Sequence, residues 1–438
     1  MKKAFSNIKF VKGIMACLLA AASVLASALW ASPVSAVAET PTIENAKTAY
    51  VSCLETGDVL FQHNPETEIF TTSSTKIMTA IVAIEALDGR LDEKVTVTSQ
   101  MLAEVSGNRF GLVAGEEVTV NDLIHILVTG GNNDGAYCLA YLTSGSVSAF
   151  VGKMNEKAAT LGAFSTHYTN PTGMHDDDMV TTVTDTALIA KYAWSLPVFE
   201  EASSTPKYVM EATNKADYRN IYNRNCLISK YYDANYYNES CAGINAGSTQ
   251  QGGHCVITVA KKDSLSYLII VMGAESTDKI YSYTNVNALA DWAFSSFAMV
   301  DVLFEENMIC EIPVTLSSAV DYVTLAPAKT VSVFLPTDVD IENEITYSWQ
   351  TTEESLEAPV SKGQVVGKVS AVYDGNIIAS GDLVVTSDVE SSDFLYQLSR
   401  IEKLTKSKGF IAAVISAIVL SISVVLFNAY RRKNRGVF

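Results

Sequence analysis

Two apolar segments, one near each end of the chain, leave the region between them to form the folded part of this protein. The first, Ile14 to Trp30, follows four lysines and leads into small residues. This order is typical of a secretory signal peptide, so we predict one over residues 1–38 with cleavage after Ala36 or Ala38. A membrane-spanning first helix fits less well, because the small residues follow directly. The rest of the chain is then exported.

The second apolar segment, Phe410 to Phe427, has 18 residues without a charge, which is enough to span a bilayer. We predict a transmembrane helix over residues 410–430, preceded by a juxtamembrane connector over 391–409. With an exported N-terminus, the tail 431–438 is cytoplasmic, and its basic residues agree with this orientation. The expected location is the cell membrane, crossed once, with the folded region outside the cytoplasm. The basic residues of the tail are Arg431, Arg432, Lys433 and Arg435.

Acidic residues are confined to the region between the two apolar segments. The 48 acidic residues all fall between Glu39 and Glu402, whereas four lysines lie in the predicted signal and six basic residues lie from Lys406 onward. Residues 39–405 therefore carry 21 basic side chains and a net charge of −27. Such a surface repels nucleic acid and anionic headgroups, so neither is an expected partner of the exported region.

The sequence pattern changes near Phe304. Before it, helical runs alternate with short strands, and after it, from Cys310 to Thr386, short alternating segments predict an all-β module over residues 305–390. An Asp374-Gly375 turn followed by apolar residues predicts a hairpin there. The helices predicted in the first region are Thr75–Leu87, Asn121–Val128, Gly135–Leu142, Ser146–Leu161 and Thr184–Ser195.

A Ser-x-x-Lys sequence, Ser73 to Lys76, begins the first of these helices. Residues at i and i+3 share one helix face, so the two side chains can meet. A serine at this point lies near the positive end of the helix dipole, which favours a developing alkoxide. The lysine can act as a base if burial or a nearby cation makes its proton labile. The pair is a candidate nucleophile and base.

The chain resembles the serine D-alanyl-D-alanine carboxypeptidases, the low-molecular-mass penicillin-binding proteins of peptidase family S11. The similarity is ordered and covers nearly the whole chain, which implies an α/β (α+β) fold. Residues 39–304 would form a serine β-lactamase/penicillin-binding-protein-like catalytic domain, with an antiparallel sheet flanked by helices, and residues 305–390 a small all-β C-terminal domain. The segments that carry the resemblance are Ala49–Val51, Thr56–Phe61, Ser73–Ala80, Asn170–Met174, Thr182, Asp185–Tyr192, Leu356–Val360 and Lys362–Gly367.

The resemblance implies a catalytic mechanism. Ser73 would attack the peptide bond between the two terminal D-alanines of a peptidoglycan stem peptide, and Lys76 would take the serine proton. The backbone N–H groups of Ser73 and Ser248 would form the oxyanion hole. β-Lactams would acylate the same serine. The resemblance implies neither a metal nor another cofactor, and no histidine has to act.

Two motifs of this family are altered here. The Ser-x-Asn motif aligns with Gly131-Asn132-Asn133, so Asn133 remains as the third catalytic candidate while Gly131 replaces the serine. The Lys-Thr-Gly motif aligns with Asn245-Ala246-Gly247, which leaves Asn245, Gly247, Ser248 and Gly131 as the candidate substrate-binding residues. Losing two hydrogen bonds to the substrate carboxylate would cost roughly two to four powers of ten in rate or affinity.

Other residues could supply part of the missing carboxylate site, and the sequence leaves the choice open between Ser248, Thr249 and Arg224. Loss of the motif lysine also removes a cation that would keep Lys76 neutral. A second Ser-x-Asn sequence, Ser106 to Asn108, lies where the family has a connecting loop. We interpret it as unrelated to the catalytic motif.

The altered motifs leave alternative functions open. The first is a catalytically impaired pseudoenzyme that keeps the fold and acts as a peptidoglycan-binding sensor or scaffold. A β-lactamase of the same superfold fits less well, because the C-terminal domain and anchor resemble the carboxypeptidases. A metal-dependent peptidase built on His167, His175 and Asp176–Asp178 is weaker again, since these residues are expected in a hydrated loop.

Several further residues have structural interpretations. Six cysteines remain after the predicted signal, and Cys241 and Cys255 flank an expected hairpin, where they could form a disulfide. Buried free thiols are the favoured interpretation. His125, within an apolar helix, is expected to be a core or boundary histidine. Asp134 and Asp185 are expected to cap or anchor helices.

Overall fold

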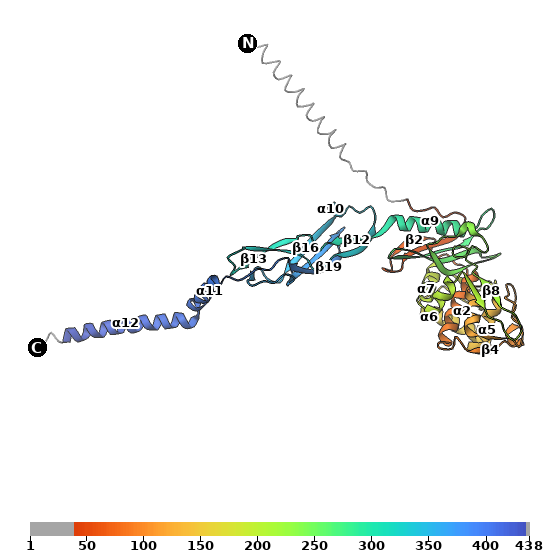
Figure 1. The fold of residues 1–438 in the computed structure, drawn as a ribbon, viewed down its shortest axis with the longest axis horizontal. Coiled ribbons are helices and arrows are strands. Elements are labelled where there is room, and N and C mark those ends of the chain that lie inside the picture. Colours follow the sequence, from red (N-terminus) through yellow and green to blue (C-terminus); the bar gives the residue numbers. More distant parts are fainter. Residues whose placement is uncertain (1–38, 435–438) are drawn as a thin grey trace, which may run out of the picture. The chain divides into compact units, whose positions relative to one another are not determined.

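A computed structural model of the chain describes residues 39–434, and the predicted signal peptide over 1–38 lies outside these described residues. The described chain divides into two compact units, drawn in Figure 1. The first contains residues 39–298 together with 336–338, and the second contains residues 299–335 and 339–434.

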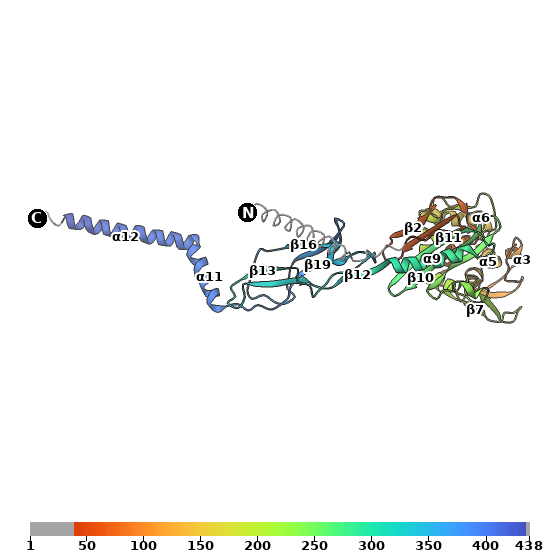
Figure 2. The ribbon, with the colours of Figure 1, turned by 90° about the horizontal axis from the view of Figure 1, so that it is seen from above.

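An antiparallel sheet forms the framework of the first unit. Its strand order among the described residues is β2-β1-β11-β10-β9. The two central strands β10 and β11 are buried along almost their whole length, because helices cover both faces of the sheet. Figure 2 shows α9 running along β10 and β11. The strands are β1 (Thr48–Cys53), β2 (Val59–His63), β9 (Cys241–Thr249), β10 (Gly253–Lys262) and β11 (Leu265–Ala274).

Several helices of the first unit pack around α2, and the unit also contains three short strand pairs. The pairs are β3 (Ile69–Phe70) with β6 (Val180–Thr181), β4 (Lys94–Thr96) with β5 (Glu117–Thr119), and β7 (Lys207–Met210) with β8 (Arg219–Tyr222). The helices are η1 (Thr72–Ser74), α2 (Thr75–Ala86), α3 (Ser99–Leu102), α4 (Val120–Val128), α5 (Asn133–Ser144), α6 (Val147–Thr160), α7 (Val183–Trp194), α8 (Pro197–Ser204), η2 (Ala234–Tyr236) and α9 (Tyr281–Ser296). The five predicted helices are confirmed to within two residues at each end.

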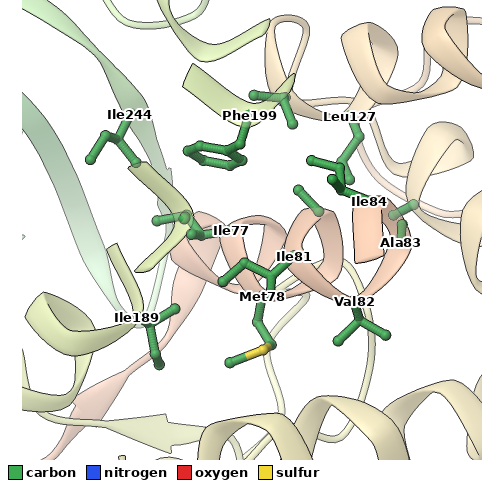
Figure 3. Close-up of a cluster of buried hydrophobic side chains, with 14 of the residues drawn as sticks. Ile77, Met78, Ile81, Val82, Ala83, Ile84, Leu127, Ile189, Phe199 and Ile244 are labelled. Carbon is green, nitrogen blue, oxygen red and sulfur yellow. The ribbon is translucent and has the colours of Figure 1, made fainter. Parts of the chain in front are cut away.

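Helix α2 is a core helix, buried on all sides from Thr75 to Ile84. A helix that is apolar all round is stable only inside a protein, where neighbouring elements cover it. Figure 3 shows this packing, with Phe199 of α8, Leu127 of α4 and Ile244 of β9 around the apolar side chains of α2. The position of α2 is therefore fixed by elements that are distant in the sequence.

The second unit is an all-β module, as the sequence predicts, and two helices follow it. Its larger sheet has the order β16-β18-β19-β14-β13-β17, and β12 pairs with β15. The elements are β12 (Phe297–Leu303), β13 (Cys310–Thr315), β14 (Tyr322–Pro327), β15 (Val331–Pro336), α10 (Ile341–Glu344), β16 (Ile345–Thr351), β17 (Leu356–Glu357), β18 (Val365–Tyr373), β19 (Asn376–Val385), α11 (Asp393–Lys406) and α12 (Lys408–Asn434).

The predicted hairpin between β18 and β19 is confirmed. Asp374 and Gly375 both have positive φ, at 47° and 75°, as a two-residue turn that matches the twist of the strands requires. Further along the chain, residues 408–431 of α12 are long and apolar enough to cross a membrane by length and composition. The connector before it contains the helix α11, which the sequence interpretation did not specify.

The strand register rules out the disulfide alternative for Cys241 and Cys255. The expected hairpin is present as β9 and β10, but Cys241 lies opposite Ala260 and Cys255 opposite Gly247. The two thiols therefore lie at different points along the strand pair. Both cysteines are buried and free, as the favoured interpretation predicted.

Candidate active site

The turn that precedes α2 holds Ser73 at the start of the buried helix. Ser73 is the middle residue of η1, and Lys76 is the second residue of α2. Ser74 Oγ donates to Thr71 O at 2.5 Å and Thr75 Oγ1 donates to Thr71 Oγ1 at 2.8 Å. These bonds tie the turn to the chain before it, rather than capping the helix N-terminus in the usual way. The serine side chain is left half-buried at the edge of the core.

Lys76 is almost completely buried, with 7% of its surface exposed. Its Nζ donates to Thr172 O at 2.5 Å. Burial lowers the pKa of the Lys76 ammonium to about 8, and the positive charge of Arg224 is the second, smaller cause. A lysine with such a pKa has a substantial neutral fraction near neutral pH, which a general base requires.

The segment Asn170 to Gly173 is held against α2 by its own side chains. Asn170 Oδ1 accepts from the backbone N–H groups of Thr172 and Gly173, at 3.1 and 3.0 Å. Thr79 Oγ1, one turn along α2 from Lys76, donates to Pro171 O at 2.7 Å. The carbonyl that Lys76 contacts is therefore part of a fixed loop.

Strand β9 passes close to the serine. Ser73 Oγ donates to Asn245 Oδ1 at 2.9 Å, so in this state the hydroxyl points to β9 rather than to Lys76. A Cβ at Gly247 would lie 2.7 Å from Ser73 Oγ, which is too short for a side chain to fit. Glycine at 247 therefore allows the strand to approach the serine.

Asn133, at the start of α5, is 97% buried next to the same pocket. Its Nδ2 donates to Ser106 O at 2.7 Å, and its backbone N donates to Asn108 O at 2.8 Å. Its Oδ1 has no hydrogen-bond partner among the described residues. A buried acceptor left unpaired costs about 1–3 kcal/mol, so this atom is suited to accept a hydrogen bond from a ligand.

A pocket of about 540 Å³ is lined by all seven residues predicted to be catalytic or substrate-binding. They come from three parts of the chain that meet only in the folded protein, since η1 and α2, the loop before α5, and β9 are far apart in sequence. Their roles remain predictions. The residues are Ser73, Lys76, Gly131, Asn133, Asn245, Gly247 and Ser248.

The structure also adds residues that sequence reasoning had set aside. Gly107 and Asn108 line the pocket, and their segment is bound to Asn133, so the loop that we interpreted as unrelated belongs to its wall. Arg224 lines the same pocket, although its position could not be derived from the sequence. The asparagines on either side of it, Asn223 and Asn225, were the local signal that could have pointed to it.

The residues considered for a metal site do not cluster in the structure. Within residues 39–434, no group of three or more His, Cys, Asp or Glu side chains is arranged to hold an ion. His175 lines the pocket, stacks edge-on against Phe70 and lies 3.3 Å from the exposed Asp177. The donor set needed for a bound metal is therefore not assembled by these residues.

The residues with structural interpretations lie as expected. His125 is buried, stacks on Tyr208 at 3.7 Å between ring centroids, and contacts Thr129 Oγ1 through Nδ1 at 2.9 Å. Burial lowers the pKa of its imidazole to about 4, so it is neutral at physiological pH. Asp134 accepts three backbone N–H groups from residues 110–112 and anchors that loop to α5.

Comparison with known protein families gives two matches that together cover most of the chain. The family described as D-alanyl-D-alanine carboxypeptidase matches residues 35–276. The family described as penicillin-binding protein 5, C-terminal domain, matches residues 300–391. The two matches fall on the two parts of the chain that the sequence pattern separates.

Individual relatives are similar over most of their length. D-alanyl-D-alanine carboxypeptidase DacF of Bacillus subtilis is 28% identical over 359 residues, which cover 81% of this chain and 88% of the relative. DacC of Escherichia coli is 28% identical over 348 residues, covering 77% and 82%.

Solved structures show the same likeness. Penicillin binding protein 5 from Haemophilus influenzae has a TM-score of 0.57 and 26% identity, covering 81% of this chain and all of that one. The Streptomyces K15 DD-transpeptidase has a TM-score of 0.53 and 26% identity, covering 59% and 99%. The penicillin-binding-protein-like fold expected from the sequence is thereby confirmed.

Proposed function

Because this chain belongs to the peptidase S11 family of D-alanyl-D-alanine carboxypeptidases, we propose that it removes the terminal D-alanine of peptidoglycan stem peptides through an acyl-enzyme on Ser73. The observation that carries this proposal is the buried Lys76, whose lowered pKa suits a base. It lies three residues after Ser73, and both residues line the pocket. The intact trio of Ser73, Lys76 and Asn133 favours turnover over the pseudoenzyme alternative.

The first step is attack of the serine on the substrate carbonyl. Ser73 Oγ leaves its hydrogen bond to Asn245, turns to Lys76 and attacks the carbonyl carbon of the penultimate D-alanine, while Lys76 Nζ takes the hydroxyl proton. Catalytic hydrogen bonds are often absent from free enzymes and form only with substrate. The backbone N–H groups of Ser73 and Ser248 would donate to the developing oxyanion.

The second step releases the leaving group and restores the serine. The C–N bond breaks as the nitrogen of the terminal D-alanine takes a proton from Lys76, which leaves an ester on Ser73. Water then adds to this ester with Lys76 again accepting its proton. The ester C–O bond breaks as Ser73 Oγ takes that proton from Lys76, and the shortened peptide departs as a carboxylic acid. Asn133, with its unpaired Oδ1, is placed to accept a hydrogen bond from the substrate amide.

Partners and location follow from the same proposal. β-Lactams carry a strained amide and a carboxylate, so they would acylate Ser73 in place of the peptide. We propose that residues 39–304 form the catalytic domain and 305–390 the C-terminal domain outside the cytoplasm. The helix from Lys408 to Arg431 would anchor them, with 431–438 in the cytoplasm.

Serine-dependent acylation tests the proposal. The full chain in detergent is incubated with benzylpenicillin, digested, and analysed for a mass increase on the peptide that contains Ser73. We expect an adduct in the native chain and none in Ser73→Ala. The matched control Ser74→Ala, which removes the adjacent hydroxyl bound to Thr71 O, should keep the adduct. Absence of an adduct in a folded native chain would reject the enzyme and favour a peptidoglycan-binding pseudoenzyme.

A further inference from the structure

The pocket lacks the usual groups that would hold a substrate carboxylate on β9. Asn245 and Ala246 are both neutral, and Ala246 has no side-chain donor. Among the described residues that line the pocket, the lysine and arginine side chains are Lys76 and Arg224. Lys76 is buried and bound to Thr172 O, which leaves Arg224 as the cation exposed to the pocket.

The backbone around Arg224 is fixed by two buried asparagines. Asn223 Nδ2 donates to Ser203 O at 2.9 Å and to Thr205 O at 3.1 Å, at the end of α8. Asn225 Nδ2 donates to Gly243 O at 3.0 Å, which ties the segment to β9 two residues before Asn245. Arg224 itself is exposed between these neighbours. Its side chain therefore starts from a rigid point beside the strand wall of the pocket.

Gly131, which replaces the motif serine, lies next to Arg224. It has a φ of +61°, and a Cβ built on it would lie 3.5 Å from Arg224 Cγ, at ordinary van der Waals distance. The backbone conformation at 131 is one that serine rarely adopts. The two departures from the family motifs, at Gly131 and at Asn245, line the same pocket as Arg224.

The guanidinium of Arg224 is not committed to a carboxylate of the protein. Within residues 39–431, none of the ion pairs includes Arg224. Its Cζ lies 5.1 Å from the ring centroid of Tyr232, a contact that orients the group without neutralising it. Its charge also acts on Lys76 deeper in the pocket. Arginine matches the planar geometry of a carboxylate and can donate two parallel hydrogen bonds to it.

We propose that Arg224 binds the terminal carboxylate of the peptide or β-lactam, in place of the lysine and threonine that β9 lacks. This inference rests on the proposed function, since it assigns a recognition residue to the same pocket. Of the three candidates that the sequence left open, Ser248, Thr249 and Arg224, all of which line the pocket, Arg224 is the one that carries a positive charge. The carboxylate site is thus moved from the strand to the loop that follows β8.

Acylation by a charged and an uncharged probe tests the assignment. Benzylpenicillin carries the carboxylate, and its methyl ester does not. For Arg224→Gln in the full chain we expect the acylation rate constant to fall about 10- to 150-fold with benzylpenicillin, the range for hydrogen bonds to a charged group. With the methyl ester it should fall much less. Equal losses with the two probes would overturn the proposal, because Arg224 would then act only through Lys76.

Two further variants control this comparison. Arg90→Gln removes an exposed arginine outside the pocket lining, whose guanidinium is paired with Glu93, and should leave both rates unchanged. Asn245→Lys in the Arg224→Gln background restores a cation on β9 and should recover at least part of the benzylpenicillin rate. No recovery, in a double variant with a native melting temperature, would count against a carboxylate at this position.

Equilibrium binding separates this proposal from failure of catalysis. The Ser73→Ala chain is titrated with an N-acylated peptide that ends in D-Ala-D-Ala, and with the same peptide as a C-terminal amide. We expect tighter binding of the acid, and loss of that preference in Ser73→Ala/Arg224→Gln. This result would support the anchor even if the native chain were never acylated. Equal affinity for both peptides, including no detectable binding of either, would overturn it.

Discussion

The helical wall of the pocket carries Ser73, Lys76 and Asn133, the reacting groups that the family pattern predicts, whereas the strand wall carries Asn245 and Ala246 where that pattern has lysine and threonine. The backbone of the strand wall is nevertheless close to the serine, with Gly247 opposite Ser73. The comparison shows that the geometry of a site and its binding groups can change separately. Strand pairing fixes the geometry of the site, whereas single side chains decide which groups can bind a ligand.

The largest effect should come from the base on the helical wall. Lys76→Met keeps the volume of the side chain but removes the proton acceptor, so the acylation rate constant should fall by about 10²- to 10⁴-fold. Stopped-flow acylation by benzylpenicillin measures it. Lys157→Met, which removes a lysine paired with Glu85 away from the pocket, is the matched control and should keep the native rate. A native rate in Lys76→Met would contradict the comparison, because the helical wall would then not provide the general base.

The next effect tests the close approach of the two walls. In Gly247→Ala the new Cβ would lie 2.7 Å from Ser73 Oγ and 2.8 Å from its Cβ, so the serine or the strand has to move. A displacement of about 1 Å at a reacting group can cost on the order of 10²-fold in rate. Gly152→Ala is the control, since nothing lies within 4 Å of its added Cβ and it should stabilise α6 by up to about 1 kcal/mol. An unchanged rate in Gly247→Ala would contradict this geometry.

The pH dependence of acylation tests how burial and Arg224 set the pKa of Lys76. The base works when neutral, and the pKa of Lys76 is lowered from 10.5 to about 8, so the rate should rise with pH and reach half of its maximum near pH 8. Between pH 7 and 9 the rise should be about tenfold. Removing the charge in Arg224→Gln should move the midpoint to higher pH. Acylation by penicillin methyl ester gives the profile, and a flat profile would exclude Lys76 as the titrating group.

The smallest effect should come from Asn245. In Asn245→Ala the Ser73 hydroxyl no longer has to leave a hydrogen bond before it turns to Lys76. Because such a bond is worth about 1 kcal/mol, the acylation rate should rise by about fivefold at most. A fall of more than tenfold with the methyl ester would instead make Asn245 part of the catalytic machinery. In that case the strand wall would supply a catalytic group as well as the helical wall.

Local sequence patterns predicted the elements of this fold well. The helix over Thr75–Ala86 follows from its apolar run, and the hairpin at Asp374 and Gly375 follows from turn residues that tolerate positive φ. These features depend on interactions between residues close together in the sequence. Burial of the apolar side chains of α2 was also predictable, because an apolar helix is suited to a protein core or a membrane.

Contacts between distant segments were not predictable from the same patterns. The loop at Ser106 to Asn108 belongs to the pocket because Asn133 binds its backbone, and no local signal marks such a contact. The register of β9 against β10, which separates Cys241 from Cys255, depends on where the turn between the two strands falls, at residues 250–252. Sequence separation carries no information about these pairings.

The sequence by itself determined the candidate nucleophile and base, the order of the motifs and the two departures from them, because these are statements about residue identity and local spacing. Only the tertiary structure decided that Ser73 Oγ contacts Asn245, that Lys76 is buried, and that Arg224 enters the pocket beside Gly131. The physical reason is that burial and charge depend on what surrounds a group. The surroundings of these three residues come from segments about 90 to 170 positions apart, which meet only when the sheet and α2 have packed.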